Sequence, residues 1–127
     1  METIVEHLVK LALVEDLGET GDVTSAAVIP PGQHIHARIV AKQGGVICGL
    51  MLVTEAYRQV DPAVVVTPTL NDGDFVTEGN LVCEVDGAGR SVLAGERVAL
   101  NFLQRLSGIA SLTAQFVAAV EGTNAVI

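Results

Sequence analysis

The feature that most constrains this chain is a helical segment whose apolar side is too wide for a surface helix. At the helical period, the apolar side chains of residues 92–106 cover an arc of roughly 220°, about twice what a surface helix needs. They are Val92, Leu93, Val98, Ala99, Leu100, Phe102, Leu103 and Leu106. The narrow remaining arc carries Arg97, Asn101, Gln104 and Arg105. We therefore expect this helix to lie mostly buried, between two packed layers.

The composition fits one domain with an aliphatic core. The chain has 127 residues, of which 50% are hydrophobic but only 3% aromatic, so Val, Leu, Ile and Ala must fill the interior. Thirteen glycines indicate many turns and close backbone approaches, which argues against a pure helix bundle. A net charge of −8 argues against nucleic acid and anionic membranes as partners, because phosphate binding needs a basic face.

The sequence offers no signal for a membrane or for secretion. No apolar run reaches the ~18 residues of a membrane helix, and the N-terminus lacks the basic and apolar regions of a secretory signal. Cys48 and Cys83 lie in apolar, strand-like contexts, which favours buried reduced thiols over a disulfide. We therefore expect a cytoplasmic protein.

The order of the helix and strand patterns predicts an α+β fold. Helices are expected at residues 4–16, 50–60, 91–107 and, after a break at Gly108, 109–121; strands are expected at 34–42, 46–48, 63–67 and 81–85. Ser91 is expected to cap the third helix. The first helix should bury Ile4, Val5, Leu8, Leu11 and Ala12, and the first strand Ile35, Ala37, Ile39 and Ala41. Residues 125–127 look like the start of a buried strand, which favours a chain cut from a longer α/β protein.

Three polar residues form a stripe along the helix at 92–106. Arg97, Asn101 and Arg105 are spaced four residues apart, and with Arg90 this stretch holds three of the seven basic residues. Arginine suits the capture of a small anion, because its planar guanidinium binds a carboxylate through two parallel N–H groups. The residues alone nevertheless favour a solvated helix face with incidental arginines. Glu96 interrupts the apolar arc, and we expect it to be structurally paired rather than catalytic.

Three segments of the chain resemble a known enzyme family. GERVALNFLQRLSGIAS at residues 95–111 is similar to the helix that ends the N-terminal domain of type II phosphoribosyltransferases of the quinolinate branch. LVEDLGETGDVTS at 13–25 is similar to that family's Glu-Asp-Leu followed by Gly-Asp-Val-Thr. A weaker likeness covers AKQGGVICGL at 41–50, with Asp72-Gly-Asp and Glu78-Gly. Because their order and spacing fit, the resemblance spans the whole chain.

The resemblance implies an enzyme of NAD biosynthesis that joins quinolinate to the ribose of phosphoribosyl pyrophosphate (PRPP). Pyrophosphate and carbon dioxide are lost, and nicotinate mononucleotide is formed. The implied fold is an open-faced α/β sandwich at residues 1–110, with a four-stranded, mostly antiparallel sheet. Residues 111–127 would be the opening helix and first strand of an α/β barrel that this chain lacks.

The resemblance also implies one substrate-binding residue. In the family's head-to-tail homodimer, the arginine of Gly-Glu-Arg reaches quinolinate in the partner's barrel, and this role falls on Arg97, with Asn101 and Arg105 as candidate supporting residues. The PRPP site and the Mg²⁺ that accompanies PRPP belong to the barrel. We therefore expect no catalytic residue, metal ligand or cofactor in this chain, and no activity of the chain alone.

Two other functions compete with this interpretation. A paralogue that acts on nicotinate, or one associated with molybdate transport, would share the fold but not the substrate. Residues 72–85 also resemble the strand–turn–strand of biotinyl and lipoyl carriers, which need a lysine at an exposed hairpin tip. Lys10 is expected in a helix and Lys42 lacks the flanking methionines of such carriers, so we expect shared geometry rather than shared function.

Two further pairs of residues, one of histidines and one of aspartates, are expected to be structural. His34 and His36 share a strand face and could hold a metal weakly, but no third ligand is near in the sequence, so exposed histidines are expected. Asp16 and Asp22 resemble an acid pair, but Asp22 is expected to cap backbone N–H groups in an N-terminal turn.

Overall fold

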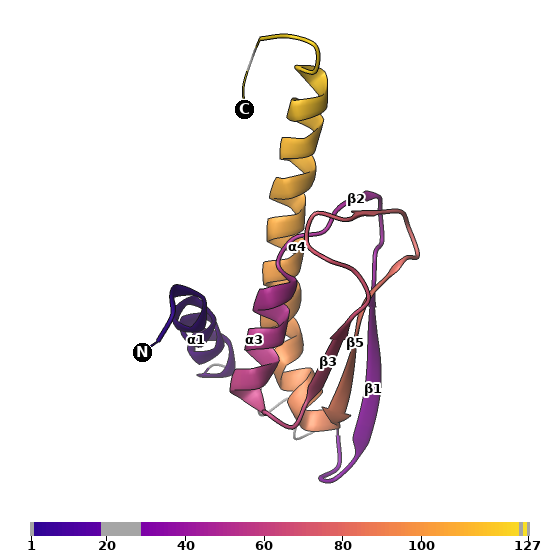
Figure 1. Ribbon diagram of the computed structural model, residues 1–127. Helices are drawn as coiled ribbons and strands as arrows, with labels where there is room; N and C mark the ends of the chain where they lie inside the picture. The colour runs from indigo at the N-terminus through magenta and orange to yellow at the C-terminus, as the bar shows by residue number, and fades with distance from the viewer. Residues whose placement is uncertain (1, 19–28, 125, 127) are drawn as a thin grey trace.

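The chain folds as an antiparallel sheet backed by helices (Figure 1). The computed structural model describes residues 2–18, 29–124 and 126. Its helices are α1 (Ile4–Asp16), α3 (Leu50–Val60) and α4 (Gly89–Ala119), and its strands are β1 (His34–Val40), β2 (Gly45–Val46), β3 (Val65–Pro68), β4 (Phe75–Val76) and β5 (Leu81–Ala88). Figure 1 shows α1 on one side of the α3–α4 pair and the main sheet on the other. The α+β sandwich predicted from the sequence is confirmed.

The strands form two small sheets rather than one of four strands. The main sheet has the order β1-β5-β3, and β2 pairs separately with β4, a strand that the sequence did not predict. All pairs are antiparallel. The two-residue strands are too short to show a period of two, and their pairing depends on backbone bonds beyond them: Gly73 N donates to Ile47 O at 2.7 Å and Ile47 N to Asp74 O at 3.0 Å.

The inner face of the main sheet follows the predicted alternation. Ile35, Ala37 and Ile39 of β1 point inward, as expected, between exposed neighbours. The register between β1 and β5 shifts between Ile39 and Val40, which leaves one extra residue on β5. Val82 and Cys83 are consequently both buried, although they are adjacent in a strand.

The predicted apolar face of α1 is only partly correct, since Val5 and Ala12 pack against the core but the other three predicted residues do not. Val9 and Leu13 are buried, at 0% and 7% exposed, whereas Ile4, Leu8 and Leu11 are 80%, 48% and 54% exposed. Apolar residues occur on nearly every side of this helix, so its periodicity does not determine which side faces the core. Contact with α3 and α4 selects the side that carries Val9 and Leu13.

The last two predicted helices are one continuous helix. Gly108 lies inside α4, because a glycine costs a helix only about 1 kcal/mol and keeps its backbone N–H donor. Ser91 is not the N-cap, since α4 begins at Gly89; its hydroxyl instead donates to Asp61 Oδ2 at 2.8 Å. The expected domain boundary between residues 110 and 111 falls within α4.

Both cysteines are free thiols, as predicted, but Cys48 is only half-buried. Cys83 is fully buried, and burial raises the pKa of its thiol to about 11. None of the described helices combines the length and apolarity needed to cross a membrane. The cap expected at Asp22 lies outside the described residues, as do two of the three residues of the strand expected at 125–127.

Candidate functional site

The lower half of α4, residues 89–106, is held against α3 by a glycine and a tyrosine. Tyr57 of α3 is 2% exposed, and its hydroxyl donates to Val92 O of α4 at 3.0 Å. A Cβ at Gly95 would lie 2.7 Å from Tyr57 Cε1, so only glycine permits this approach. Burial, and then the charge of Glu96, raise the pKa of the Tyr57 hydroxyl. Gly95 therefore fixes the start of the Gly-Glu-Arg sequence on the body of the domain.

The polar stripe of α4 faces solvent, as predicted. Arg97, Asn101, Gln104 and Arg105 are all exposed, while the opposite side of the helix buries Val92, Val98, Ala99 and Leu103. Arg97 has 76% of its side chain exposed. The helix therefore presents the Arg97 guanidinium to solvent, two residues after Gly95, which packs against Tyr57 of α3.

Arg97 has an acidic partner that the sequence did not predict. Its Nε lies 3.6 Å from Asp16 Oδ1, at the last residue of α1, and only 16% of the Asp16 side chain is exposed. No other described residue pairs with Arg97. Asp16 therefore approaches the Nε side of the guanidinium and leaves its two terminal nitrogens available to a further anion.

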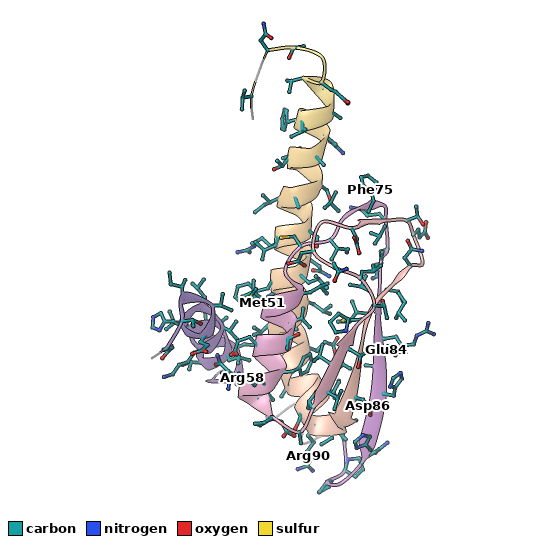
Figure 2. The ribbon with its side chains drawn as sticks, in the orientation of Figure 1. Met51, Arg58, Phe75, Glu84, Asp86 and Arg90 are labelled. Atoms are coloured by element: carbon teal, nitrogen blue, oxygen red, sulfur yellow. The ribbon has the colours of Figure 1, made fainter. Side chains whose placement is uncertain are left out.

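The other charged residues of α4 do not converge on Arg97. Arg105 and Asn101 share its face, but their side chains form no hydrogen bond or ion pair with a described residue. Arg90, at the lower end of the helix in Figure 2, donates from Nε to Ile29 O at 2.8 Å. Glu96 is exposed and forms no ion pair within the described part of the chain, so its predicted structural pairing is wrong.

Two serines connect the upper half of α4, residues 107–119, to the small sheet. Ser107 Oγ accepts from Cys48 N at 3.0 Å and donates to Cys48 O at 3.1 Å. Ser111 Oγ makes the same pair of contacts with Val46, at 2.9 and 3.4 Å. A Cβ at Gly45 would lie 2.5 Å from Ser111 Oγ, so this approach also requires glycine. The two hydroxyls bond the backbone of β2 and of Cys48, two residues after it, as a neighbouring strand would.

A groove of about 950 Å³ separates α4 from the inner face of the main sheet. Its walls are mainly aliphatic and include Ile39, Val85, Leu100 and Leu103, with Glu96, Gln104 and Lys42 among its polar residues. These residues provide no activated nucleophile, and the two serines among them bond the backbone of Val46 and Cys48. The groove can accommodate apolar groups, but its residues do not assemble a catalytic site.

The outer face of the main sheet pairs two histidines with two carboxylates. His34 Nε2 lies 2.8 Å from Asp86 Oδ1, and His36 Nε2 lies 3.3 Å from Glu84 Oε1. Glu84 and Asp86 are labelled on β5 in Figure 2. The histidines are exposed, as predicted, and no group of three or more His, Cys, Asp or Glu within the described residues could hold a metal ion. These contacts are cross-strand pairs that stabilise the sheet.

The small sheet lacks the geometry of a biotinyl or lipoyl carrier. Lys42 lies between β1 and β2, which belong to different sheets, rather than at a hairpin tip. The turn between β4 and β5 is closed by Thr77 and Asn80, with Thr77 N donating to Asn80 Oδ1 at 2.8 Å. Asp72, from the Asp-Gly-Asp segment, accepts from Gly49 N and Leu50 N at 3.1 Å and caps α3. These acidic and glycine-rich turns are structural.

Comparisons with known proteins agree with the resemblance read from the sequence. The family model described as "Quinolinate phosphoribosyl transferase, N-terminal domain" matches residues 22–107. The chain is 43% identical over 109 residues to the chloroplastic nicotinate-nucleotide pyrophosphorylase [carboxylating] of Arabidopsis thaliana, covering 86% of this chain and 31% of the relative. It is 37% identical over 113 residues to a probable enzyme of the same name from Bacillus subtilis, covering 89% and 38%.

Solved structures give the same result. The nicotinate-nucleotide pyrophosphorylase from Francisella tularensis superposes with a TM-score of 0.86 at 31% identity, covering 94% of this chain and 42% of that one. NadC from Streptococcus pyogenes also gives 0.86, at 39% identity, covering 91% and 41%. The chain thus spans between about a third and two fifths of the length of these relatives.

Proposed function

Because this chain belongs to the quinolinate phosphoribosyltransferase family, by its N-terminal domain, we propose that it contributes Arg97 to the quinolinate site of a complete enzyme. That enzyme transfers phosphoribosyl from PRPP to the ring nitrogen of quinolinate, releases pyrophosphate and carbon dioxide, and forms nicotinate mononucleotide. The observation that carries the proposal is the exposed guanidinium of Arg97 in the Gly-Glu-Arg sequence.

The position of Arg97 suits a residue that binds substrate held mainly by another domain. Its terminal nitrogens form no hydrogen bond with a described residue, and Gly95 fixes its helix against α3. One exposed arginine cannot by itself hold a dicarboxylate firmly, since exposed ion pairs are weak. We propose that quinolinate lies in the barrel of a partner subunit, in a head-to-tail homodimer, and that Arg97 closes the site from the opposite side. Arg105 and Asn101, on the same face, support this contact.

The upper part of α4 suits a junction with a second domain. Ile109, Leu112, Phe116 and Val117 are each more than half exposed, and residues 106–120 carry no charge. We propose residues 1–110 as the sandwich domain and residues 111–127 as the opening of a barrel whose surface covers these side chains. On this proposal the chain alone is inactive.

No magnesium site is assigned to this chain. The described residues contain no cluster that could hold a metal ion. We propose that the Mg²⁺ that accompanies PRPP is held by other parts of the complete enzyme. The cytoplasmic location expected from the sequence remains a prediction, since the Arabidopsis relative is named as chloroplastic.

Substitution of Arg97 in a complete enzyme tests the proposed function. The enzyme is assembled by joining residues 1–127 to the remaining part of the Bacillus subtilis relative. Removing one partner of a desolvated charge pair costs about 2–5 kcal/mol, and about 1.4 kcal/mol corresponds to a tenfold change in affinity. Arg97→Ala should therefore raise the KM for quinolinate roughly thirtyfold or more. Arg97→Lys should restore little, because an ammonium cannot reproduce bidentate geometry.

Two controls make this experiment decisive. Arg105→Ala removes the same charge from the same face and should raise the KM for quinolinate less than Arg97→Ala does. The KM for PRPP should change in neither variant. A folded complete enzyme that releases no pyrophosphate from PRPP and quinolinate would contradict the proposed reaction. An unchanged KM for quinolinate in Arg97→Ala would contradict the assignment of Arg97.

A further inference from the structure

Asp16 occupies a position that its own helix does not favour. It is the last residue of α1, and the last turn of this helix contains no basic residue. A carboxylate there lies at the negative end of the helix dipole, where a cation would be favoured instead. The side chain is nevertheless only 16% exposed and lies against Arg97 Nε at 3.6 Å. Among the described residues, the charged partner of Asp16 is therefore Arg97, from a different helix.

The contact restricts Arg97 without blocking it. A guanidinium has five N–H donors, and a carboxylate on the Nε side leaves the end formed by the two terminal nitrogens open. An arginine with 76% of its side chain exposed would otherwise sample many rotamers, and binding an anion would have to restrict them. Asp16 connects Arg97 to α1, so the guanidinium has a second point of attachment beyond α4.

We infer that Asp16 is a positioning residue for Arg97: it holds the Nε side of the guanidinium so that the terminal nitrogens meet a substrate carboxylate in bidentate geometry. This inference rests on the proposed function of Arg97. Asp16 also repels the substrate anion, but the positively charged guanidinium lies between the two carboxylates and offsets that repulsion. Orientation is therefore the larger effect, and removal of Asp16 weakens binding.

Asp16→Ala in the complete enzyme described above tests the inference. The KM for quinolinate should rise about threefold to tenfold, while kcat and the KM for PRPP stay within about twofold, since Asp16 acts only through Arg97. Glu15→Ala is the matched control, because Glu15 is an exposed acid on the same turn without a contact to Arg97. It makes the same change in charge and should leave the KM for quinolinate unchanged.

A double substitution separates positioning from a general structural role. In the Arg97→Ala background, Asp16→Ala should raise the KM for quinolinate no further, because the residue it positions is gone. A further rise there, or an unchanged or lower KM in the single variant Asp16→Ala, would overturn the inference and leave the proposed function intact. No effect of Arg97→Ala itself would instead overturn the proposed function, so the two failures are distinguishable.

Discussion

The two halves of α4 are similarly apolar but have opposite surroundings. In the lower half, residues 89–106, seven residues are buried: Gly89, Val92, Ala94, Gly95, Val98, Ala99 and Leu103. In the upper half, residues 107–119, all of which are described, none is buried. Figure 1 shows this half extending beyond the rest of the domain. The same helix is therefore packed into the core along its lower half and leaves an apolar surface exposed along its upper half.

This difference shows what a helical apolar pattern can and cannot report. The pattern indicates that a side of the helix needs a partner, because burial of apolar surface stabilises it. It does not indicate whether that partner lies within the same 127 residues. The lower half contacts α3 and the sheet, while the upper half is connected to the body by the hydroxyls of Ser107 and Ser111.

Truncation of a leucine in each half gives the largest expected contrast. Leu103 is 5% exposed and Leu112 is 54% exposed. Leu103→Ala should lower the free energy of unfolding by about 2–5 kcal/mol, because it leaves a cavity in the core. Leu112→Ala should cost about 1 kcal/mol or less in the 127-residue chain. Urea denaturation of both variants measures the difference.

The same pair of variants sharpens the comparison in the complete enzyme. If a barrel covers the upper half, Leu112→Ala should destabilise the complete enzyme clearly more than it destabilises the 127-residue chain. Equal losses for Leu103→Ala and Leu112→Ala in the chain alone would show that the two halves do not differ as described.

Two glycines, one in each half, should respond to alanine with opposite signs. A Cβ at Gly95 would lie 2.7 and 2.9 Å from two atoms of the buried Tyr57 ring, whereas a Cβ at Gly108 would meet nothing within 4 Å. Gly95→Ala should therefore destabilise the chain by about 1–3 kcal/mol through overpacking. Gly108→Ala should stabilise it by up to about 1 kcal/mol, the helix propensity gained. Thermal unfolding of the two variants checks the signs, and a stabilising Gly95→Ala would contradict the close packing.

The helices and strands were more predictable from the sequence than the packing between them. The alternation of β1 and the wide apolar arc of α4 gave the correct buried sides, because each pattern leaves one side clearly polar. In α1, apolar residues surround the helix, so only contact with α3 and α4 decides that Val9 and Leu13 are buried. The strand β4 was not predicted, because its two residues lie between the turn-forming segments Asn71-Asp-Gly-Asp and Glu78-Gly.

The candidate site was predictable at Arg97 but not at its partner. Arg97 belongs to a long motif and to a polar stripe, both of which are local features of the sequence. Its ion pair with Asp16 joins residues 81 positions apart and depends on how α1 packs. An acidic residue in the last turn of a helix without a basic neighbour was the one local signal. The approach of Tyr57 to Gly95 depends in the same way on tertiary packing.

The two serines at the boundary between the halves give a smaller expected effect. Ser111→Ala removes the acceptor for Val46 N and the donor to Val46 O, and Ser107→Ala does the same for Cys48. Each should lower the free energy of unfolding by about 0.5–1.5 kcal/mol. Amide hydrogen exchange at Val46 and Cys48 should accelerate in the corresponding variant. Thr113→Ala is the control, because Thr113 Oγ1 donates only within its own helix, to Ile109 O.

The smallest expected effect is a response to pH confined to the lower half. The Ser91 hydroxyl, and then the Ala63 N–H, hold the pKa of Asp61 below its ordinary value of 3.8. A lowered pKa in the folded state stabilises the fold above pH 3.8, and this contribution is lost as the pH falls through the folded-state pKa. Ser91→Ala removes the larger cause, so the Asp61 pKa should rise toward its ordinary value in an NMR titration. Residues 107–119 contain no ionisable side chain, so hydrogen exchange in the upper half should not respond to the substitution at any pH. A Ser91→Ala variant that loses protection in the upper half as the pH falls would show that the two halves unfold as one unit.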